Sequence, residues 1–312
     1  MRDLPHSYEY HRERRRGKRR FDDDEPLFQK RQRHARALPS LDVIDETDGL
    51  PEGDRWSTWD QLHAGERGPQ PYPDWLVTEL AAVDTELGIL KTGKEADVFL
   101  LRRGVPRAGP PCLLAAKRYR DTGHRMFHRD SGYVEGRRVR QSRTNRAVAN
   151  RTAFGREAMA DQWAVAEFAA LVQLFQAGVP VPYPVSVQGT EVLLEFIGDA
   201  DGTAAPRLAE LRPPGELLVL LWDQLVEATV TLARHGLAHG DLSAYNLLVQ
   251  DGRLVLIDLP QVVDVITNPQ GAMYLDRDAA NVAAWFKARG LTGVDPAPDE
   301  LAARLRYEAR LE

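Results

Sequence analysis

The sequence predicts an α+β protein with two lobes, a first lobe rich in strands and a second, reduced lobe made mainly of helices. Three observations predict this fold class. Short apolar runs bounded by turn residues lie between residues 87 and 119, long helical apolar patterns dominate after residue 215, and a glycine-containing segment at 195–199 separates the two halves. We therefore expect the first lobe to span about 80–197 and the second about 198–312.

The composition fits a folded chain that is not a fibrous, disulfide-linked or membrane-spanning protein. Of the 312 residues, 43% are hydrophobic, which is too many for a wholly disordered chain. The single cysteine, Cys112, excludes a disulfide framework and a cysteine-ligated metal cluster. No apolar run approaches the roughly 18 residues of a membrane span, and no signal peptide is evident. We expect a cytoplasmic protein without a membrane partner.

The formal net charge of −5 is unevenly distributed along the chain. Residues 1–40 carry +5 and residues 118–156 carry +8, which leaves −18 for the rest. Residues 1–72 are charged and end in a stretch rich in glycine and proline, so we expect a disordered, solvated tail, with an arm for an anionic partner as the alternative. The folded domain is expected to span 73–312.

The first lobe is expected to contain strands, one long helix and a hairpin. The long helix has an apolar face that ends at Gly178, and the hairpin turns at Gln188-Gly189. Between the third strand and this helix, residues 120–151 are rich in arginine and lack a clear period, so we expect a long mobile loop. The elements in chain order are a helix over 75–83, strands over 87–90, 96–101 and 112–119, a helix over 157–177, and strands over 184–187 and 191–197.

The second lobe is expected to begin with a loop and to contain three helices. A glycine, Gly236, follows the first helical pattern, and Asp251-Gly252 forms a turn between two short strands. The expected elements are a helix over 216–235, strands over 247–249 and 254–258, and helices over 276–289 and 298–311.

The strongest functional signal is the segment His239-Gly-Asp-Leu-Ser-Ala-Tyr-Asn246, followed by Asp258 at a strand end. Mg²⁺ takes oxygen ligands from one or two side chains and the remainder from phosphates and water. Asn246 and Asp258 would supply those ligands, which leaves Asp241 to orient or deprotonate an attacking hydroxyl. His239 is expected to hold the loop backbone rather than to react. The pattern therefore predicts phosphoryl transfer.

A lysine on the third strand supports this interpretation. Lys117 lies at the end of an apolar strand, 50 residues before Glu167 on the following helix. In phosphoryl-transfer enzymes such a lysine neutralises the α- and β-phosphates and is held by a helix carboxylate. Glu157 is the rival carboxylate, and the mid-helix position favours Glu167.

Two further segments are candidate nucleotide contacts. The turn at 91–96 lacks a full glycine-rich loop, yet Thr92, Gly93 and Lys94 would offer a hydroxyl, backbone N–H groups and a cation to phosphates. A plain hairpin turn would look similar. The backbone of Glu195 and Ile197, at the link between the lobes, would face an adenine edge, although an ordinary strand–loop junction has the same appearance.

With these residues assembled, the chain resembles the RIO family of atypical serine/threonine protein kinases over roughly residues 80–290. The segment Lys91-Thr-Gly-Lys-Glu-Ala-Asp-Val98 is similar to the family's S-T-G-K-E-A-x-V loop, and residues 239–246 match H-G-D-L-S-x-Y-N closely. The remaining similar segments are Trp163-Ala-Val-Ala-Glu-Phe168, Glu195-Phe-Ile-Gly198, Ile257-Asp-Leu-Pro-Gln261 and Leu275-Asp-Arg-Asp-Ala-Ala-Asn-Val282. No N-terminal winged helix is apparent, so the group without one is the better match.

The resemblance implies a small protein-kinase-like fold that uses ATP with Mg²⁺, or Mn²⁺ in its place. It implies a protein substrate or autophosphorylation, with Asp258 as a metal ligand and a candidate phosphate acceptor. It also implies that the activation segment of ordinary protein kinases is missing. Archaeal and eukaryotic relatives act in small ribosomal subunit assembly. The arginine-rich loop and the basic tail would then contact ribosomal RNA or a pre-ribosomal particle. A solvated, flexible loop that folds over bound ATP is the alternative for residues 120–151.

Two other functions remain open at this point. A small-molecule phosphotransferase of the aminoglycoside or choline kinase kind also uses H-G-D-x-x-x-x-N and a later I-D, although the 91–96 loop and the short second lobe disfavour it. A nucleotide-gated assembly scaffold without turnover is disfavoured because Lys117, Asp241, Asn246 and Asp258 are all present.

Overall fold

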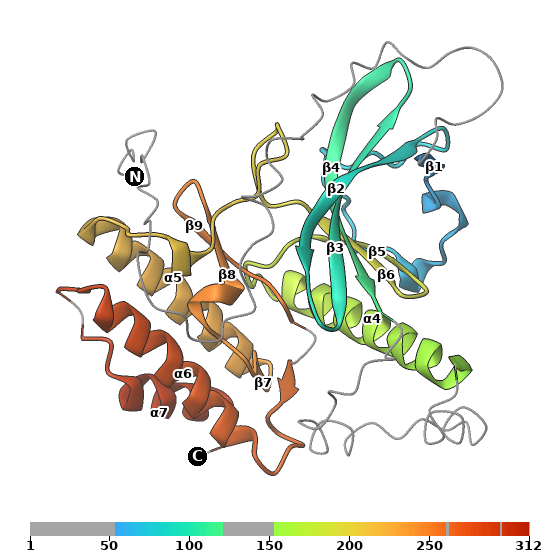
Figure 1. Cartoon of the computed structure of the whole chain (residues 1–312). Coiled ribbons are helices and arrows are strands. Elements are labelled where there is room, and N and C mark those ends of the chain that lie inside the picture. Colours follow the sequence, from blue (N-terminus) through green and yellow to red (C-terminus); the bar gives the residue numbers. More distant parts are fainter. Residues whose placement is uncertain (1–53, 121–152, 260–261, 294, 312) are drawn as a thin grey trace.

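The first lobe is an antiparallel sheet with a long helix on one face (Figure 1). The computed structural model describes residues 54–120, 153–259, 262–293 and 295–311. Six strands lie in the order β1-β2-β3-β4-β6-β5, so β4 and β6 are central neighbours. The strands are β1 (Asp54–Trp56), β2 (Val83–Thr92), β3 (Ala96–Val105), β4 (Ala108–Tyr119), β5 (Pro184–Gln188) and β6 (Glu191–Glu195).

Helix α4 (Ala153–Gln176) packs against one face of this sheet. Its buried residues Ala160, Ala164 and Phe168 meet Tyr119 of β4 and Val192 of β6. The predicted helix over 157–177 is confirmed, and Gly178 ends it with a φ of 80°. Side chains alternate between the two faces of a strand, so Lys117, two residues before Tyr119 on β4, faces the same helix.

Residues 54–77 cover the opposite face, which differs from the expectation of a disordered tail up to residue 72. Trp59 and Leu62 are buried there against Leu114 of β4. The covering segment contains β1 and the short 3-10 helices η2 (Trp59–Gln61) and η3 (Ala64–Glu66). At Gly68 a Cβ would lie 2.0 Å from the carbonyl oxygen of Pro184, so the close approach to β5 requires glycine.

The helix expected over 75–83 is wrong. This stretch consists of turns and extended backbone, and its last residue, Val83, begins β2. Leu76 is buried in the apolar cover described above. The apolar residues of this stretch thus pack on the sheet from a non-helical backbone, although their spacing is typical of a helix.

The second lobe is formed by three helices and two small sheets. Helix α5 (Gly215–Arg234) lies at its centre, with α6 (Gly271–Ala288) and α7 (Pro298–Glu308) packed beside it (Figure 1). Strand β7 (Leu237–Ala238) pairs with β10 (Val263–Asp264), and β8 (Leu247–Gln250) pairs with β9 (Arg253–Leu256). Short 3-10 helices are η4 (Leu208–Glu210) and η5 (Ala244–Asn246). All the elements predicted for this lobe are present, with bounds shifted by a few residues at most of their ends.

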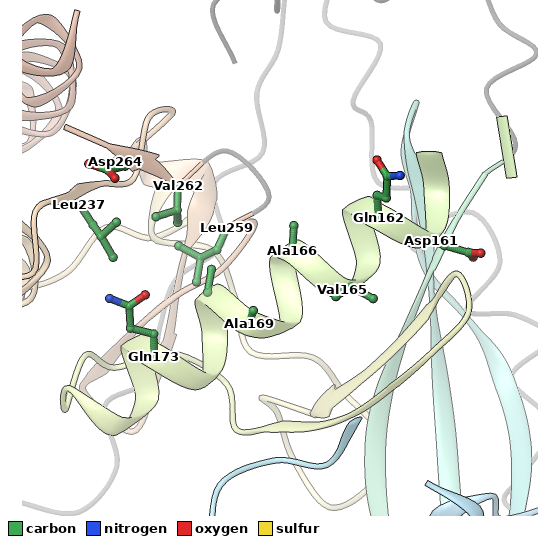
Figure 2. A pocket seen from close by; sticks show the side chains of 11 residues that line it. Asp161, Gln162, Val165, Ala166, Ala169, Gln173, Leu237, Leu259, Val262 and Asp264 are labelled. Atoms are coloured by element: carbon green, nitrogen blue, oxygen red, sulfur yellow. The ribbon is translucent and has the colours of Figure 1, made fainter. Parts of the chain in front are cut away.

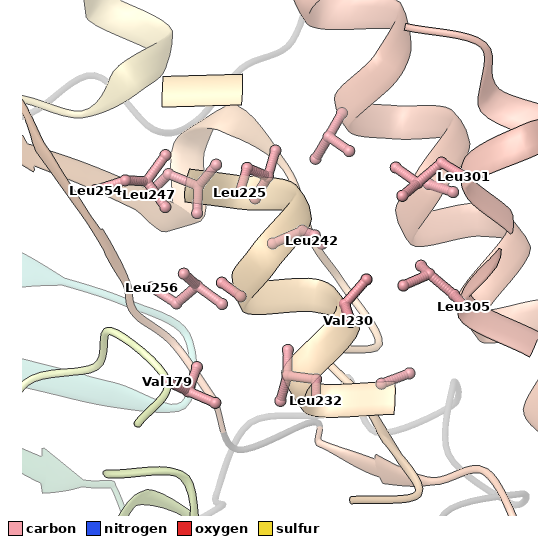
Figure 3. Packing of buried hydrophobic residues seen from close by; sticks show 14 of the residues in the cluster. Val179, Leu225, Val230, Leu232, Leu242, Leu247, Leu254, Leu256, Leu301 and Leu305 are labelled. Carbon is pink, nitrogen blue, oxygen red and sulfur yellow. The ribbon is translucent and has the colours of Figure 1, made fainter. Parts of the chain in front are cut away.

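The core of the second lobe is aliphatic and holds the loop at 239–246 in place. Figure 3 shows Leu225 and Val230 of α5 beside Leu242 of that loop, with Leu301 and Leu305 of α7 on the far side. All of these side chains are almost completely buried. Leu242 directly follows Asp241 in the chain, so its burial anchors the loop next to Asp241.

The link between the lobes is a narrow turn after β6. At Gly198 a Cβ would lie 2.3 Å from the carbonyl oxygen of Thr203, so a side chain would displace the turn. Gln250 of β8 donates from Nε2 to the carbonyl oxygen of Gly198 at 2.7 Å, which fastens the link to the second lobe. Within the described ranges, none of the helices combines the length and apolar character that a membrane-spanning segment requires.

Candidate active site

A lysine, a glutamate and an aspartate from three elements meet where the lobes face each other. The Lys117 Nζ on β4 lies 2.6 Å from Glu167 Oε1 on α4 and 3.2 Å from Asp258 Oδ1 after β9. The Tyr119 hydroxyl donates to the other oxygen of Glu167. The structure thus pairs Lys117 with Glu167, whereas the side chain of the rival, Glu157, is not among those described.

The charges in this cluster support one another. Burial alone would lower the pKa of Lys117, but the carboxylates of Glu167 and Asp258 outweigh it and the pKa is raised. Burial would raise the pKa of Asp258, but Lys117 and then Lys91 outweigh it and the pKa is lowered. At neutral pH the lysine is a cation and the aspartate an anion, as binding of phosphates and a divalent metal requires.

Asp258 is held in an unusual backbone conformation. Its φ is 65°, in the left-handed region that residues with a Cβ seldom adopt. Such conformations persist where the surrounding structure fixes them, and they gather at functional sites. Here the backbone N–H of the preceding residue, Ile257, donates to the carbonyl oxygen of Asn246 at 2.9 Å, so Asp258, just after β9, and Asn246, just before β8, are held near each other.

The loop at 239–246 is fixed mainly through its backbone. The amides of Gly240 and Leu242, on either side of Asp241, donate to the two oxygens of Asp278 on α6 at 2.9 and 3.0 Å. His239 is buried, and its Nε2 lies 3.1 Å from the carbonyl oxygen of Ile257. His239 therefore holds the loop, as the sequence predicts, and Asp241 projects from a rigid support.

Asp241 and Asn246 offer oxygen atoms of the expected kinds. The Asp241 side chain is exposed, so a substrate hydroxyl can reach it. The Asn246 Nδ2 donates to the carbonyl oxygen of Asp241 at 2.9 Å, which leaves Oδ1 as the atom for a ligand. No group of three or more histidine, cysteine, aspartate or glutamate residues that would hold a metal occurs in the described part of the chain. A donor set of Asn246 and Asp258 fits Mg²⁺ that completes its shell with phosphates and water.

The predicted phosphate turn lies at the tip of β2 and β3. Thr92 and Lys94 are exposed, and the Gly93 amide donates to the carbonyl oxygen of Ala96 at 3.0 Å. A Cβ on Gly93 would approach that oxygen to 2.8 Å. Lys91, at the base of the turn, lies near Asp258 with its Nζ 3.9 Å from Oδ2. The turn is thus placed over the second lobe's site residues.

The link residues Glu195 and Ile197 make hydrogen bonds to neighbouring segments of the protein. The Glu195 carboxylate accepts from the amide of Tyr183 at 3.0 Å, and the carbonyl oxygen of Ile197 accepts from Ala205. In the described part of the chain, no hydrogen bond from the Ile197 amide is found.

Three residues of the site were not among the predicted ones: Tyr119, Asp278 and Lys91. Tyr119 lies two residues beyond Lys117 on the same face of β4, and this alternation was the available signal. Asp278 lies within the segment Leu275-Asp-Arg-Asp-Ala-Ala-Asn-Val282, where its burial was not visible from sequence. Lys91 begins the 91–96 turn. The arginine-rich loop, the basic tail and Pro260-Gln261 lie outside the described residues.

A hollow of about 540 Å³ lies beside this cluster of site residues, between α4 and the second lobe. Figure 2 shows Ala166, Ala169 and Gln173 of α4 facing Leu259 and Val262 across it. Leu259 directly follows Asp258 in the chain, yet none of the predicted site residues lines this hollow. The chemistry is therefore assigned to the cluster around Lys117 and Asp258.

Comparisons with known proteins agree with this arrangement. Residues 114–298 match the family model described as the RIO domain. The chain is 36% identical over 209 residues to the RIO-type serine/threonine-protein kinase Rio1 of Haloferax volcanii, covering 67% of this chain and 65% of that protein. It is 29% identical over 225 residues to serine/threonine-protein kinase RIO1 of Saccharomyces cerevisiae, covering 66% and 44%. Thus it spans less than two thirds of the length of these relatives.

The fold also resembles a solved structure, that of the Rio2 kinase–ADP/Mg²⁺–phosphoaspartate complex from Chaetomium thermophilum. The TM-score is 0.50 at 22% identity, covering 72% of this chain and 64% of the other. This likeness shows a protein-kinase-like fold. Because the family model covers more than half of the sequence, and the lysine, the helix glutamate and the two loop segments meet in one site, the chain belongs to the RIO domain family.

Proposed function

We propose that this protein is an atypical serine/threonine kinase or ATPase that transfers the γ-phosphoryl group of ATP with Mg²⁺, or Mn²⁺ in its place. The observation that carries the proposal is the contact of Lys117 with both Glu167 and Asp258, which joins a phosphate-binding cation to a metal-binding carboxylate across the two lobes. The names of the relatives, which are serine/threonine-protein kinases, support it.

Each site residue has a distinct role in this proposal. Lys117, held by Glu167, binds the α- and β-phosphates, and the turn of Thr92, Gly93 and Lys94 covers them. The backbone of Glu195 and Ile197 binds the adenine edge. Asn246 and Asp258 hold Mg²⁺, which when bound neutralises charge on the phosphates.

The transfer itself needs one base and one leaving group. The acceptor oxygen forms a bond to the γ-phosphorus while the bond from that phosphorus to the bridging oxygen breaks, and ADP leaves with the electron pair. Asp241, exposed on its braced loop, takes the proton of the acceptor hydroxyl or water. With water as the acceptor the reaction is ATP hydrolysis, and with a side chain it is phosphorylation of a protein or of the chain itself.

Asp258 is a further candidate acceptor in this proposal. The similar Rio2 structure is that of a complex with ADP, Mg²⁺ and phosphoaspartate. In this chain Asp258 is an anion beside two lysines, so attack of its carboxylate on the γ-phosphorus would form an acyl phosphate and release ADP. Hydrolysis of that acyl phosphate would restore Asp258 and release phosphate.

Two alanine substitutions test the proposal. We expect Asp241→Ala and Asp258→Ala both to abolish phosphate release from ATP, and Asp241→Ala to retain ATP binding better because Asp258 belongs to the metal site. Release is measured with a phosphate assay and binding by titration with a fluorescent ATP analogue. Asp276→Ala, which removes a half-exposed carboxylate of α6 that pairs with Arg306 of α7, is the control. Undiminished turnover in either site variant would contradict the assignment.

The family also supports a proposal about partners. We propose that the protein works in the cytoplasm on small ribosomal subunit assembly, and that residues 120–151 and the basic tail contact RNA. Binding to ribosomal RNA should weaken steeply between 50 and 200 mM salt, roughly a thousandfold if six phosphates are contacted. Binding that is absent or insensitive to salt would contradict RNA as the partner.

A further inference from the structure

Lys91 is placed at the metal-binding carboxylate although it belongs to the other lobe. Its Nζ lies 3.9 Å from Asp258 Oδ2, while Lys117 contacts the other oxygen, Oδ1, at 3.2 Å. Asp258 thus has two cations beside it, Lys117 and Lys91, although Lys117 is already paired with Glu167.

The strand itself directs Lys91 into the site. The pairing of β2 with β3 shifts register between Ile89 and Lys91, a β-bulge. A bulge changes which face of the sheet the following side chain meets, and bulges are frequent next to active sites. Ile89, one step before the shift, is exposed, whereas Lys91 reaches Asp258. The shift in register thus turns the Lys91 side chain toward Asp258.

We propose that Lys91 is a catalytic residue that binds the γ-phosphate of ATP and stabilises the phosphoryl group during transfer. This inference rests on the proposed function, because it needs a nucleotide and a metal at Asp258. The two lysines then divide the triphosphate between them. Lys117 serves the α- and β-phosphates, and Lys91 serves the γ-phosphate.

Electrostatics explain why Lys91 must turn to the phosphate. Lys117 has Glu167 as a counter-charge and is about nine-tenths buried, so it stays in place when Asp258 takes a metal ion. Lys91 is 39% exposed and pairs with Asp258, whose charge the metal would neutralise. Cations repel each other at such distances, whereas the γ-phosphate that shares this metal is the adjacent anion. The flexible four-carbon stem of lysine allows the move.

Lys91 forms no covalent bond in the reaction. The γ-phosphorus loses its bond to the bridging oxygen and gains one to the acceptor, and Lys91 contacts the non-bridging oxygens on which negative charge is spread. The acceptor proton goes to Asp241, as proposed above. Lys91 therefore contributes charge and position and takes no part in proton transfer.

The experiment compares ATP with ADP, since ADP lacks the phosphate in question. Equilibrium dissociation constants for both nucleotides with Mg²⁺ are measured by competition with a fluorescent analogue, alongside kcat and KM. In Lys91→Met we expect affinity for ATP to fall about tenfold, the size of one charge-assisted hydrogen bond, and affinity for ADP to fall less than about twofold. Lys91→Arg should restore most of the ATP affinity. The control is Lys287→Met, an exposed lysine of α6, which should behave as the wild type.

Two outcomes would overturn the inference. Equal losses for ATP and ADP would make Lys91 a clasp between the lobes, and unchanged or tighter ATP binding would make it a counter-ion that the metal displaces. A third variant, Lys117→Met, separates this from the proposed function. If Lys117→Met loses nucleotide binding and Lys91→Met does not, the inference alone fails. If the wild type binds neither nucleotide, both fail.

Discussion

At the scale of single residues, Tyr119 is the least expected part of the site. Its hydroxyl donates to Glu167, and its pKa is raised well above the ordinary value by burial and by the neighbouring carboxylate. The hydroxyl is therefore a donor at neutral pH. Both oxygens of Glu167 are bound from β4, one by Lys117 and one by Tyr119.

Tyr119→Phe tests whether this second contact positions the lysine. We expect the KM for ATP to rise several-fold with little change in kcat, and stability to fall by about 1 kcal/mol, the typical net value of one hydrogen bond. Steady-state kinetics and denaturant unfolding measure the two effects. In a Glu167→Gln background the same substitution should cost less, and an undiminished cost there would show that Tyr119 does not act through Glu167.

Glu195 gives a stability effect that depends on pH. Burial raises its pKa, only partly opposed by the hydrogen bond from the Tyr183 amide. A carboxyl with a raised folded pKa contributes stability that is complete below its ordinary value of 4.5 and is lost as the pH rises through the folded pKa. Glu195→Gln keeps an acceptor without the charge. It should match the wild type at pH 4 and melt about 1–3 °C higher at pH 8, and a lower melting temperature at pH 8 would contradict this.

The residues that sequence predicts well are those whose chemistry is visible in the residue types. Lys117, Asp241, Asn246 and Asp258 are identifiable because oxygen ligands and a cation recur at set spacings. Lys91 was not, because its role depends on a β-bulge that no composition signal marks.

At the scale of elements, α6 braces the loop that carries the proposed base. Asp278 is buried and accepts both amides beside Asp241, and burial raises its pKa. A helix side chain thus sets the shape of a loop some 36 residues away in the chain. No periodic pattern predicts such a contact, because the period of α6 only identifies its buried face.

Asp278→Asn should disturb the loop more than the fold. The amide retains one acceptor oxygen but directs its NH₂ group at a backbone donor, so we expect a loss of about 1–3 kcal/mol in stability. The kcat should fall at least about tenfold, with the affinity for ATP nearly unchanged. Asp276→Asn, on the same helix but paired with Arg306, is the matched control. An unaltered kcat in the folded variant would contradict the bracing role.

Regular elements and irregular segments differed in how well they could be predicted. The strands β2 to β4 and the helices α4 and α5 follow from their periods and from Gly178 and Gly236, whose φ values of 80° and 70° end the helices. Residues 54–72 could not be predicted, because Trp59 and Leu62 are buried by a sheet that forms later in the sequence. Their composition alone is typical of a solvated segment.

At the scale of the whole molecule, the cover formed by residues 54–77 belongs to the folded domain. A chain that begins at residue 73 lacks Trp59 and Leu62, and burial of one such side chain contributes about 1.5–3 kcal/mol. We expect it to be at least about 3 kcal/mol less stable in denaturant unfolding than a chain that begins at residue 54. Equal stability of the two chains would show that the cover is dispensable.

The same cover reaches around to the edge of the sheet. Strand β5 is the last strand on its side, and outer strands carry backbone groups that another chain can pair with. Here the Gly68 amide donates to the carbonyl oxygen of Val185 at 2.9 Å, and the backbone of Arg67 forms an isolated antiparallel β-bridge with Ser186. At the opposite edge, β1 pairs with Val83–Thr85, the first three residues of the ten-residue β2. The segment that shields the apolar face therefore also occupies part of the β5 edge, where the sheet of another copy would otherwise be able to pair.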